Sequence, residues 1–354
     1  MKLKEVAKQL GLAPSTVSRA LNHPEMVSAE TRVRVEEAVR RVRYQPDRIA
    51  RSLRVRQTST IGLVVSDILN PFHAALASAI EEAAQQHGFT VILGNSNEDI
   101  QREQAYLEVL VASRVRGVIL VPSGVNTKGV QWVVGQGVPL VQVDRLTPGV
   151  KTDAVLLDNQ RGAALAVEHL VGLGHRRIAM IAGPPHLTTG EQRLQGYWAA
   201  LERAQIRPDE RWVFPGNFRE SGGYNGARSL LSLPPDVRPT ALITANNEMA
   251  AGAVKALGEL GLALGRDVSL VTFDDARWAQ YILPPLTVVA QPVEEIGQTA
   301  VDVLFRHFAG GSGLPARPTV YTLQPYLVAR ASTRPPAVGA SKEEVEARLP
   351  NLES

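Results

Sequence analysis

Hydrophobic and polar positions divide the 354-residue chain into two regions with different patterns. Within the first 45 residues, apolar side chains recur at helical spacing in three short stretches, which predicts three short helices. From residue 61 onward, short apolar runs alternate with longer stretches of helical periodicity. This alternation predicts parallel strands that are covered by helices on both faces.

The first region predicts two helices separated by a tight turn. Gly11 breaks the first helical stretch, and Pro14 suits the first turn of the second helix because proline lacks the amide hydrogen that would stay unbonded there. Ser28 is a favourable N-cap for the third helix. The inward stripe of that helix is predicted to be Val35, Ala38, Val39 and Val42. The first two helices, joined by a tight turn, are typical of a helix-turn-helix unit, although a plain structural helix pair has the same spacing.

In the second region the alternation occurs twice. Strands are predicted at 61–65, 91–95, 118–121 and 140–144 and then, after Asp158, at 178–182, 241–244 and 268–273. Helices are predicted near 72–87, 99–113, 160–173, 190–204, 221–232 and 247–260. Two successive sets of strands and helices indicate two sheets, and hence two α/β lobes with a cleft between them.

The patterns predict four segments along the chain. Residues 1–45 form a helical head, and residues 46–60, which are basic and lack a long apolar pattern, form a linker. Residues 61–333 form the bilobed core. Residues 334–354 are rich in Pro and Glu and are predicted to be a poorly ordered tail.

Charge is unevenly distributed between these segments. The formal net charge is only +3, but residues 1–57 carry 13 Lys and Arg against 6 Asp and Glu, so the remainder is slightly acidic. A basic head on an acidic body indicates that only the head meets a polyanion. By charge alone, an ordinary solvated basic surface remains the alternative.

Several classes of site are not predicted. The chain has no cysteine, which excludes disulfides and thiolate metal sites. Nothing near the amino terminus resembles an export signal, and no stretch approaches the roughly 20 apolar residues that span a bilayer, so a cytoplasmic protein is expected. His169 and His175 do not share a helix face, and a packing or capping role is favoured over metal binding. No catalytic constellation, cofactor fingerprint or metal site is found.

The second predicted helix carries side chains suited to DNA. It exposes Ser15, Thr16, Ser18 and Arg19 while burying Val17. Small hydroxyl groups permit close approach to phosphates, and an arginine can bind guanine in the major groove.

Longer motifs identify a family. The run Glu5-Val-Ala-Lys-x-x-Gly-Leu-x-x-x-Thr16-Val-Ser-Arg-x-Leu-Asn22 resembles the head of the lactose/galactose repressor (LacI/GalR) family. The resemblance continues through Tyr44-x-Pro46 and Ala50-Arg51-Ser52-Leu53 to about residue 333. Later landmarks are Asn70-Pro71-Phe72, Gly174-His175-Arg176, Arg193-Leu-x-Gly196-Tyr197 and Phe273-Asp274-Asp275.

For the head, the resemblance implies a helix-turn-helix DNA-binding domain with assigned contacts. The residues at base-reading positions of the major groove are Pro14, Ser15 and Arg19. The residues at phosphate-contacting positions are Thr16, Ser18, Asn22, Ser28 and Thr31. Ala13 departs from the family, because a serine cap worth about 1 kcal/mol usually stands there.

For the linker, the resemblance implies a hinge helix over residues 47–53 that folds on DNA binding. The hinge positions are Asp47, Ala50, Arg51 and Leu53. Leu53 matches an apolar lever that contacts bases in the minor groove, where wedging a side chain between base steps kinks the duplex. An ordinary helix-face leucine is the alternative. Asp47 stands where Asn is common, which suits the helix dipole but reduces the attraction to DNA.

For the core, the resemblance implies a periplasmic-binding-protein-like fold of two doubly wound parallel-sheet lobes joined by three crossings near 160, 291 and 324. Lobe 1 is then about 61–160 and 292–323, and lobe 2 is about 161–290 and 324–333. The effector-binding residues implied for the cleft between them are Phe72, Asp144, Arg193, Phe218, Asn246 and Asp274.

Arg193 and Asp274 match a pair that commonly binds ligand hydroxyls. A planar arginine fork and a carboxylate suit sugar diols, which both donate and accept hydrogen bonds. A salt bridge between the two, and a core role for Phe218, are the alternatives. Asn247 stands where Asp is more usual, which puts a charge-based role at that position in doubt.

The implied function is a transcriptional regulator, a repressor, that binds a near-palindromic operator as a homodimer under control of a small effector, expected to be a sugar. Its dimer surface is expected on the helices near 72–87 and either 221–232 or 247–260. A purine or a protein co-regulator remains open as the controlling partner, although the uncharged Leu187 favours a sugar. Whether the effector releases the protein from DNA or helps it bind also stays open.

Two other classes make different predictions. A solute-binding transport receptor predicts an export signal and no basic head. An enzyme on the same lobes predicts a nucleophile, an acid/base pair or a metal site. The sequence meets neither set of expectations.

Overall fold

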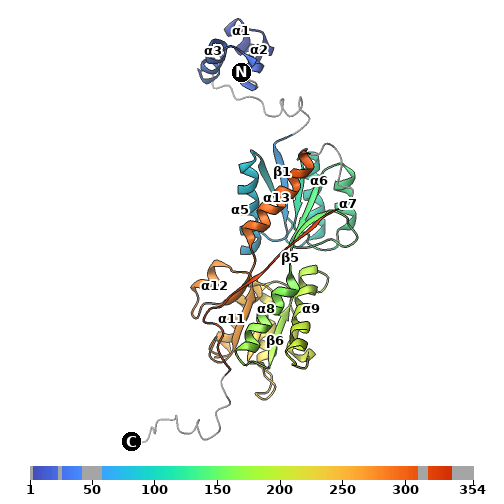
Figure 1. Cartoon of the computed structure of the whole chain (residues 1–354), viewed down its shortest axis with the longest axis vertical. Coiled ribbons are helices and arrows are strands. Elements are labelled where there is room, and N and C mark those ends of the chain that lie inside the picture. The colour runs from blue at the N-terminus through green and yellow to red at the C-terminus, as the bar shows by residue number, and fades with distance from the viewer. Residues whose placement is uncertain (1–2, 23–25, 42–57, 310–317, 337–354) are drawn as a thin grey trace, which may run out of the picture. The chain divides into compact units, whose positions relative to one another are not determined.

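The structure, a computed structural model, describes residues 3–22, 26–41, 58–309 and 318–336. It contains two compact units that divide between Thr58 and Ser59. Figure 1 shows the helical unit and the larger α/β unit, coloured along the chain.

The first unit is a bundle of three helices. They are α1 (Leu3–Leu10), α2 (Pro14–Asn22) and α3 (Ala29–Arg41). Gly11 has a φ of +66°, a left-handed conformation that glycine adopts freely, and this ends α1 as predicted. The small core of the unit is formed by Val6, Ala7, Val17, Ala20, Val35 and Ala38.

The first sheet of the larger unit is fully parallel, with the strand order β11-β5-β4-β3-β1-β2. Its strands are β1 (Thr60–Val65), β2 (Thr90–Asn95), β3 (Val118–Leu120), β4 (Leu140–Val143), β5 (Asp153–Leu157) and β11 (Val320–Leu323). One core joins it to α5 (Pro71–Gln86) and α13 (Val293–Ala309), and a separate core joins it to α6 (Ile100–Ala112) and α7 (Thr127–Gly135). Helices therefore cover both faces.

The second sheet has the strand order β12-β10-β9-β8-β6-β7. Its strands are β6 (Ile178–Ala182), β7 (Val213–Pro215), β8 (Ala241–Thr244), β9 (Ser269–Phe273), β10 (Thr287–Ala290) and β12 (Tyr326–Val328). Its helices are α8 (Asn159–Gly172), α9 (Thr188–Arg203), α10 (Glu220–Leu231), α11 (Asn247–Glu259), the short α12 (Arg277–Tyr281) and a 3-10 turn, Glu210–Trp212. The edge strand β12 pairs antiparallel with β10, whereas the sequence predicted only parallel strands.

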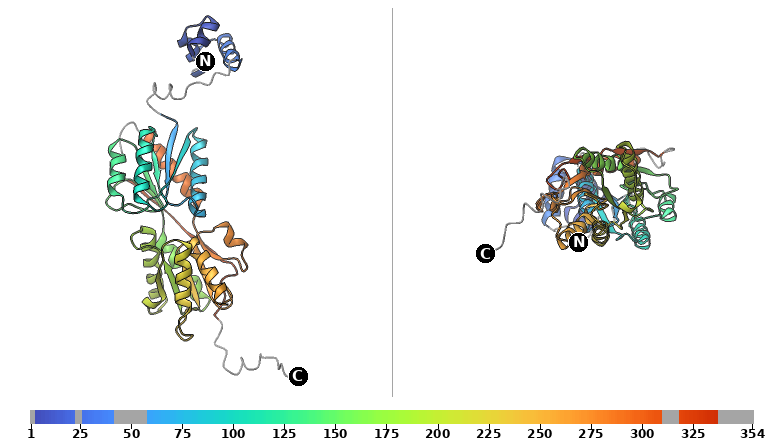
Figure 2. Two further views of the ribbon diagram at one scale, coloured as in Figure 1. Left: turned by 180° about the vertical axis from the view of Figure 1, so that it is seen from behind. Right: turned by 90° about the horizontal axis from the view of Figure 1, so that it is seen from below.

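The chain passes between the two sheets three times. It leaves the first sheet after β5, returns to it between β10 and α13, and leaves it again between β11 and β12. Each lobe is therefore assembled from distant parts of the sequence. Figure 2 shows the same arrangement from behind.

These crossings determine where ligand-binding residues can lie. In an open parallel sheet, ligands bind outside the carboxyl ends of the strands. Asp144 follows β4 of the first lobe, while Asn246 and Asp274 follow β8 and β9 of the second. All three line one cavity, so the carboxyl ends of strands from the two lobes converge there.

The end of the described chain packs on the second lobe. His175 lies within hydrogen-bond distance of Thr240 Oγ1 (2.8 Å), Ser269 Oγ (3.0 Å) and the carbonyl oxygen of Arg334 (2.8 Å). His169 lies 2.8 Å from Thr333 Oγ1. Both histidines thus hold the carboxyl-terminal segment against the lobe, in line with the predicted packing role. Arg334, the first residue of the predicted tail, still belongs to this ordered segment.

Candidate functional site

The helix α2 presents the predicted base-reading residues on its outer face. Pro14, Ser15 and Arg19 are exposed, while Val17 is fully buried against α1 and α3. Thr16 and Ser18, predicted to contact phosphates, are half-buried on the same helix. The backbone of Asn22 forms the last residue of α2. The predicted base-reading positions therefore form part of the accessible face of the unit.

Two further predicted phosphate contacts meet at the start of α3. The backbone amide of Thr31 donates to Ser28 Oγ at 3.3 Å, as expected for an N-cap, and the two hydroxyl oxygens lie 2.9 Å apart. The amino-terminal end of a helix carries partial positive charge and attracts anions. Ser28 and Thr31 are thus placed where a phosphate would be electrostatically favoured.

The predicted hinge residues Asp47, Ala50, Arg51 and Leu53 lie outside the described residues. Their roles remain predictions from the sequence.

In the larger unit, the six predicted effector-binding residues line a single cavity. They are Phe72, Asp144, Arg193, Phe218, Asn246 and Asp274, and the cavity has a volume of about 20 Å³. That space holds about one water molecule. A larger ligand therefore requires side chains or lobes to move apart.

Arg193 is held rigidly at the wall of this cavity. It lies on α9, and Gly196 on the same helix allows close packing on α8, because a Cβ there would lie 2.4 Å from the carbonyl oxygen of Gln160. The guanidinium donates from Nε to Asn159 Oδ1 at 2.8 Å. It also donates from Nη1 to the carbonyl oxygen of Ala245 at 2.5 Å and stacks 4.1 Å from the centre of the Phe273 ring.

No ion pair within 4 Å joins Arg193 to Asp274 in the described part of the chain, so the salt-bridge alternative is not what the structure contains. Asp274 instead accepts from Gln291 Nε2 at 2.6 Å and from Asn247 Nδ2 at 3.2 Å. Asn247 also donates to Asn70 Oδ1 at 2.9 Å, which links the two lobes beneath the cavity. The neutral Asn247 therefore has a structural role at the position where the sequence put a charge-based role in doubt.

Asp144 lines the cavity together with its neighbour Arg145. Burial raises the pKa of the Asp144 carboxyl group, and the nearby Arg145 counteracts part of that effect. Arg145 donates from Nη1 to both carboxylate oxygens of Glu98, at 3.0 and 2.8 Å. Although burial alone would lower the pKa of Arg145, the carboxylates of Glu98 and Asp144 raise it, so the guanidinium stays charged.

Three residues of the cavity wall have left-handed backbones. The φ angles are +67° at Asp144, +59° at Phe218 and +72° at Asp274. Such conformations are costly for residues other than glycine and cluster at ligand sites. Asp144 and Asp274 directly follow the strands β4 and β9, and Phe218 lies in the loop before α10.

Asn246 has a more structural role than its predicted one. Its Oδ1 accepts from the amide of Met249 at 2.9 Å and caps α11, and its Nδ2 donates to the carbonyl oxygen of Phe218 at 3.0 Å. The side chain thus fixes the position of Phe218 in the wall. Phe218 itself is 9% exposed and belongs both to the core of the second lobe and to the cavity.

Five lining residues were not predicted: Asn70, His73, Arg145, Thr189 and Gln291. Three of them had a signal in the sequence. Asn70 belongs to the Asn70-Pro71-Phe72 motif, Arg145 directly follows Asp144, and Gln291 lies at a predicted crossing. Thr189 and His73 carry no such signal, since their placement depends on how α9 and α5 begin.

Several polar atoms of these residues are buried without a hydrogen bond. They are Arg145 Nε, Thr189 Oγ1 and Gln291 Oε1. In addition, the carboxylate of Asp144 accepts no hydrogen bond from any described residue, and its one charged contact is Arg145 Nε at 3.4 Å. Buried polar groups are normally hydrogen-bonded, so an unpaired set around one cavity indicates a polar ligand.

The described part of the chain contains no group of three His, Asp or Glu residues that could hold a metal ion. Among the same residues, no helix is long and apolar enough to cross a membrane.

Comparison with known sequences assigns both parts of the chain. Residues 2–47 match the bacterial regulatory proteins of the lacI family, and residues 167–333 match the periplasmic binding protein-like domain. The chain is 35% identical over 303 residues to the ribose operon repressor of Escherichia coli (strain K12), covering 85% of this chain and 91% of that protein. It is 32% identical over 335 residues to the HTH-type transcriptional repressor PurR of Glaesserella parasuis, covering 94% and 98%.

Solved structures agree with the sequence comparison. The structure of the lac repressor dimer bound to operator and the anti-inducer ONPF is 31% identical, with a TM-score of 0.83, over 94% of this chain and 99% of that one. A LacI family transcriptional regulator from Enterococcus faecium with bound ribose is 32% identical, with a TM-score of 0.70, over 78% and 99%. The chain belongs to the lacI family of bacterial regulatory proteins.

Proposed function

We propose that this protein is a transcriptional repressor that binds a near-palindromic operator as a homodimer and is controlled by a monosaccharide in the cleft between its lobes. Such a protein acts on DNA in the cytoplasm and carries out no catalysis. The family membership supports the DNA-binding role, as does the exposed face of α2, where Arg19 and Ser15 stand beside a buried Val17. The lac repressor relative is a dimer on its operator.

One observation supports a sugar as the effector: donors and acceptors without hydrogen bonds lie around the same cavity. Gln291 Oε1 offers a free acceptor. Nη2 of Arg193 donates to no other described group, and Asp144 Oδ2 and Arg145 Nε face each other at 3.4 Å without a hydrogen bond between them. Each sugar hydroxyl both donates and accepts, so vicinal hydroxyls would satisfy acidic and basic groups at once. Phe72 and Phe218 supply apolar walls for the carbon face of the ring.

Among sugars, D-ribose is the first candidate. The E. faecium relative contains bound ribose, and the E. coli relative is a ribose operon repressor. The cavity of about 20 Å³ must widen to hold any sugar, and a pentose requires less widening than a larger sugar.

A homodimer would cover apolar side chains that are exposed in one protomer. Ile92 and Leu93 on β2 and Tyr106 and Val109 on α6 are exposed, as is Leu283 after α12. Isolated exposed apolar residues are common, but groups on neighbouring elements mark interfaces. We therefore propose that β2 and α6 contribute to the interface, in addition to the helices predicted from the sequence.

Calorimetric titration of the full-length protein tests the effector. D-ribose is expected to bind, while D-glucose and hypoxanthine bind at least tenfold more weakly. If hypoxanthine binds and no sugar does, the effector is a purine and the proposed sugar is wrong. If none of the three compounds binds, the proposed effector is wrong.

Selection from a random-sequence DNA pool tests the head. Purified protein should enrich a near-palindrome whose half-sites are spaced by whole helical turns, because a two-fold dimer presents two recognition helices. Enrichment of no sequence at moderate ionic strength would contradict the proposal.

A further inference from the structure

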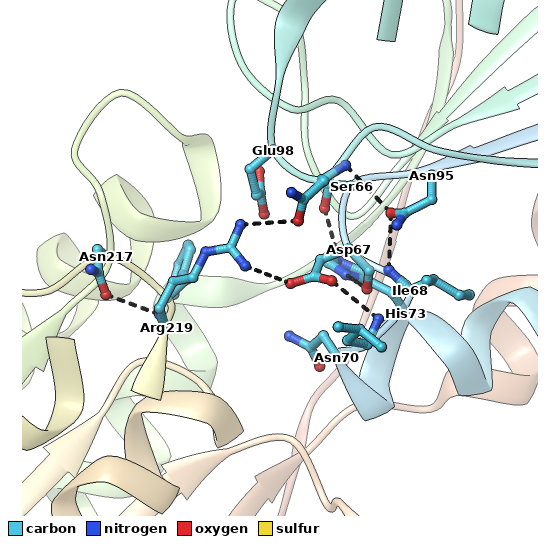
Figure 3. A network of polar contacts seen from close by, with 12 residues as sticks. Ser66, Asp67, Ile68, Asn70, His73, Asn95, Glu98, Asn217 and Arg219 are labelled. Carbon is cyan, nitrogen blue, oxygen red and sulfur yellow. Dashed lines mark hydrogen bonds and ion pairs between the residues drawn. The ribbon is translucent and has the colours of Figure 1, made fainter. Parts of the chain in front are cut away.

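At the mouth of the cleft, one arginine of the second lobe reaches across to the first. Arg219 begins α10 and donates from Nη1 to Asp67 Oδ2 at 3.1 Å (Figure 3). Its Nη2 lies 3.5 Å from Asn97 Oδ1. Asp67 and Asn97 follow β1 and β2 of the first lobe. The side chain of Asp67 is 15% exposed and that of Arg219 is 43% exposed, so the pair is partly shielded from water.

The first-lobe side of this contact is held in place by a network of hydrogen bonds (Figure 3). Asp67 Oδ1 accepts from the amide of Leu69 at 3.1 Å, which leaves Oδ2 for Arg219. The carbonyl oxygen of Asp67 lies 3.1 Å from Nδ1 of His73, and the amide of Ile68 donates to Asn95 Oδ1 at 3.1 Å. His73 also lines the effector cavity, so the loop that carries Asp67 rests on the cavity wall.

The second-lobe side is anchored to the same cavity. The amide of Arg219 donates to Asn217 Oδ1 at 3.0 Å. The preceding residue, Phe218, has a left-handed backbone and lines the effector cavity. Phe218 also borders a neighbouring cavity of about 500 Å³, whose wall includes Asp67 and Arg219. Phe218 therefore stands between the effector cavity and the large cavity, and Arg219 follows it on the side of the large cavity.

Without Arg219, carboxylates of the two lobes would repel each other at the mouth of the cleft. Glu220 and Glu248 of the second lobe line the large cavity together with Asp67 of the first. Lys255 also lines it and pairs with Glu220 at 3.6 Å, which leaves Asp67 and Glu248 as the carboxylates that Arg219 balances. Burial raises the pKa of Glu248, and the nearby Asp67 and Glu220 raise it further, while Arg219 opposes them. Loss of the arginine would thus remove an attraction and leave a like-charge contact across the cleft.

We propose that Arg219, Asp67 and Asn97 form an interlobe clasp that holds the cleft closed and sets how long an effector stays bound. An effector reaches the chamber from the large cavity when Phe218 and Arg219 swing away together. Hydrogen bonds fix the backbone of Arg219 and the carboxylate of Asp67, so closing has to order mainly the arginine side chain. The identity of the effector rests on the function proposed above, but the clasp itself does not.

Lobe separation in the effector-free protein tests the clasp directly. The chain has no cysteine, so spin labels on Gln131→Cys in the first lobe and Glu202→Cys in the second report one distance per labelled protomer when diluted with unlabelled protein. Arg219→Gln and Asp67→Asn should each shift the distribution toward longer distances. The swapped pair Arg219→Asp with Asp67→Arg should restore the short distance, and Glu248→Gln should reduce the opening caused by Arg219→Gln.

The matched control is Arg211→Gln, which removes an exposed arginine whose partner, Asp209, lies on the same lobe. It should leave the distribution unchanged. The clasp is overturned if Arg219→Gln matches this control, or if the swapped pair stays as open as the single variants.

The dissociation rate of D-ribose, measured by stopped flow, is the second test of the clasp. The dissociation rate is expected to rise about fivefold in Arg219→Gln, the factor that corresponds to ~1 kcal/mol for a partly exposed pair, and to stay unchanged in Arg211→Gln. An unchanged rate in Arg219→Gln would overturn the role in effector retention. If the parent does not bind D-ribose, the proposed effector fails, while the label distances still decide whether the clasp exists.

Discussion

Individual buried groups around the cleft are kept in unusual states by their surroundings. His73 is the clearest case, since burial, followed by the nearby Arg145, lowers its pKa from 6.5 to about 3. Neutral imidazole then lies against Asp67 and Ser66 within the first lobe. Asp144 shows the opposite shift for the same physical reason, because burial disfavours the charged form of either group.

The shifted pKa of His73 predicts a pH-dependent stability. Its folded-state pKa lies below its unfolded value, so the unfolded chain binds the extra proton between pH 6.5 and about 3, and stability falls as pH is lowered through that window. Between pH 7 and 5 the loss should reach about 2 kcal/mol. Urea unfolding at both pH values measures it.

His73→Phe should flatten this dependence, because phenylalanine cannot take up the proton. His87→Phe provides a control for the substitution itself, since the side chain of His87 is 43% exposed and lies outside the cavity wall. An equally steep slope in His73→Phe would show that another group is responsible.

Arg193 should be the strongest single determinant of effector affinity. Arg193→Met removes a charged donor at the cavity and leaves the carbonyl oxygen of Ala245 without its 2.5 Å hydrogen bond. Titration with D-ribose should show affinity reduced ten- to a hundredfold, because a hydrogen bond to a charged group is worth about 1.5–3 kcal/mol. Arg161→Met, at an exposed pair with Glu168, is the control and should bind normally. Similar affinity in both variants would remove Arg193 from the binding site.

At the scale of elements, α2 combines a packed face with an exposed face. Val17 and Ala20 bury one side in the core of the head, and this fixes the direction of Arg19 and Ser15 on the other. A recognition helix needs this division, because its orientation in the groove depends on the packing behind it.

Arg19→Ala should weaken binding to the selected operator by about 1–3 kcal/mol and relax the base preference at one position of each half-site. Arg32→Ala is the matched control, because Arg32 is exposed in the same unit but pairs with Glu36 along α3. Fluorescence anisotropy with the selected operator and with single-base variants of it gives both quantities. Equal loss on all sequences would reduce Arg19 to a phosphate contact.

The sequence predicted many of the strands and helices and missed others. The fold class was confirmed, as were all seven predicted strands to within one residue. The helices α7, α12 and α13 and the strands β5, β7, β10, β11 and β12 were not predicted. The strands β7 and β12 have only three residues each, and β11 pairs with the distant β5, so their assignment depends on contacts far along the chain. The helix α13 carries apolar residues at helical spacing over 17 residues, so its sequence did contain a signal.

The candidate site shows the same limit in physical terms. Arg193 and Asp274 stood in recognisable motifs, so all that the structure added was their position around one cavity. His73 and Thr189 entered the cavity because of how α5 and α9 begin. The clasp between Arg219 and Asp67 joins residues 152 positions apart, which no local pattern could have paired.

For the whole molecule, the proposal requires that two binding events influence each other. An effector can change operator affinity only by binding the operator-competent and operator-incompetent states differently. The three crossings between the lobes transmit a change at the cleft to the first lobe, where β1 directly continues the chain from residue 59. The sign of the effect depends on which lobe arrangement the head prefers.

Operator affinity measured against D-ribose concentration tests this coupling most directly. Full-length protein should bind its selected operator with an affinity that D-ribose changes at least fivefold, in either direction, as expected for a coupling free energy of about 1–3 kcal/mol. Arg193→Met should need a D-ribose concentration about ten- to a hundredfold higher for the same change in operator affinity. Operator affinity that is identical with and without saturating D-ribose would contradict the account.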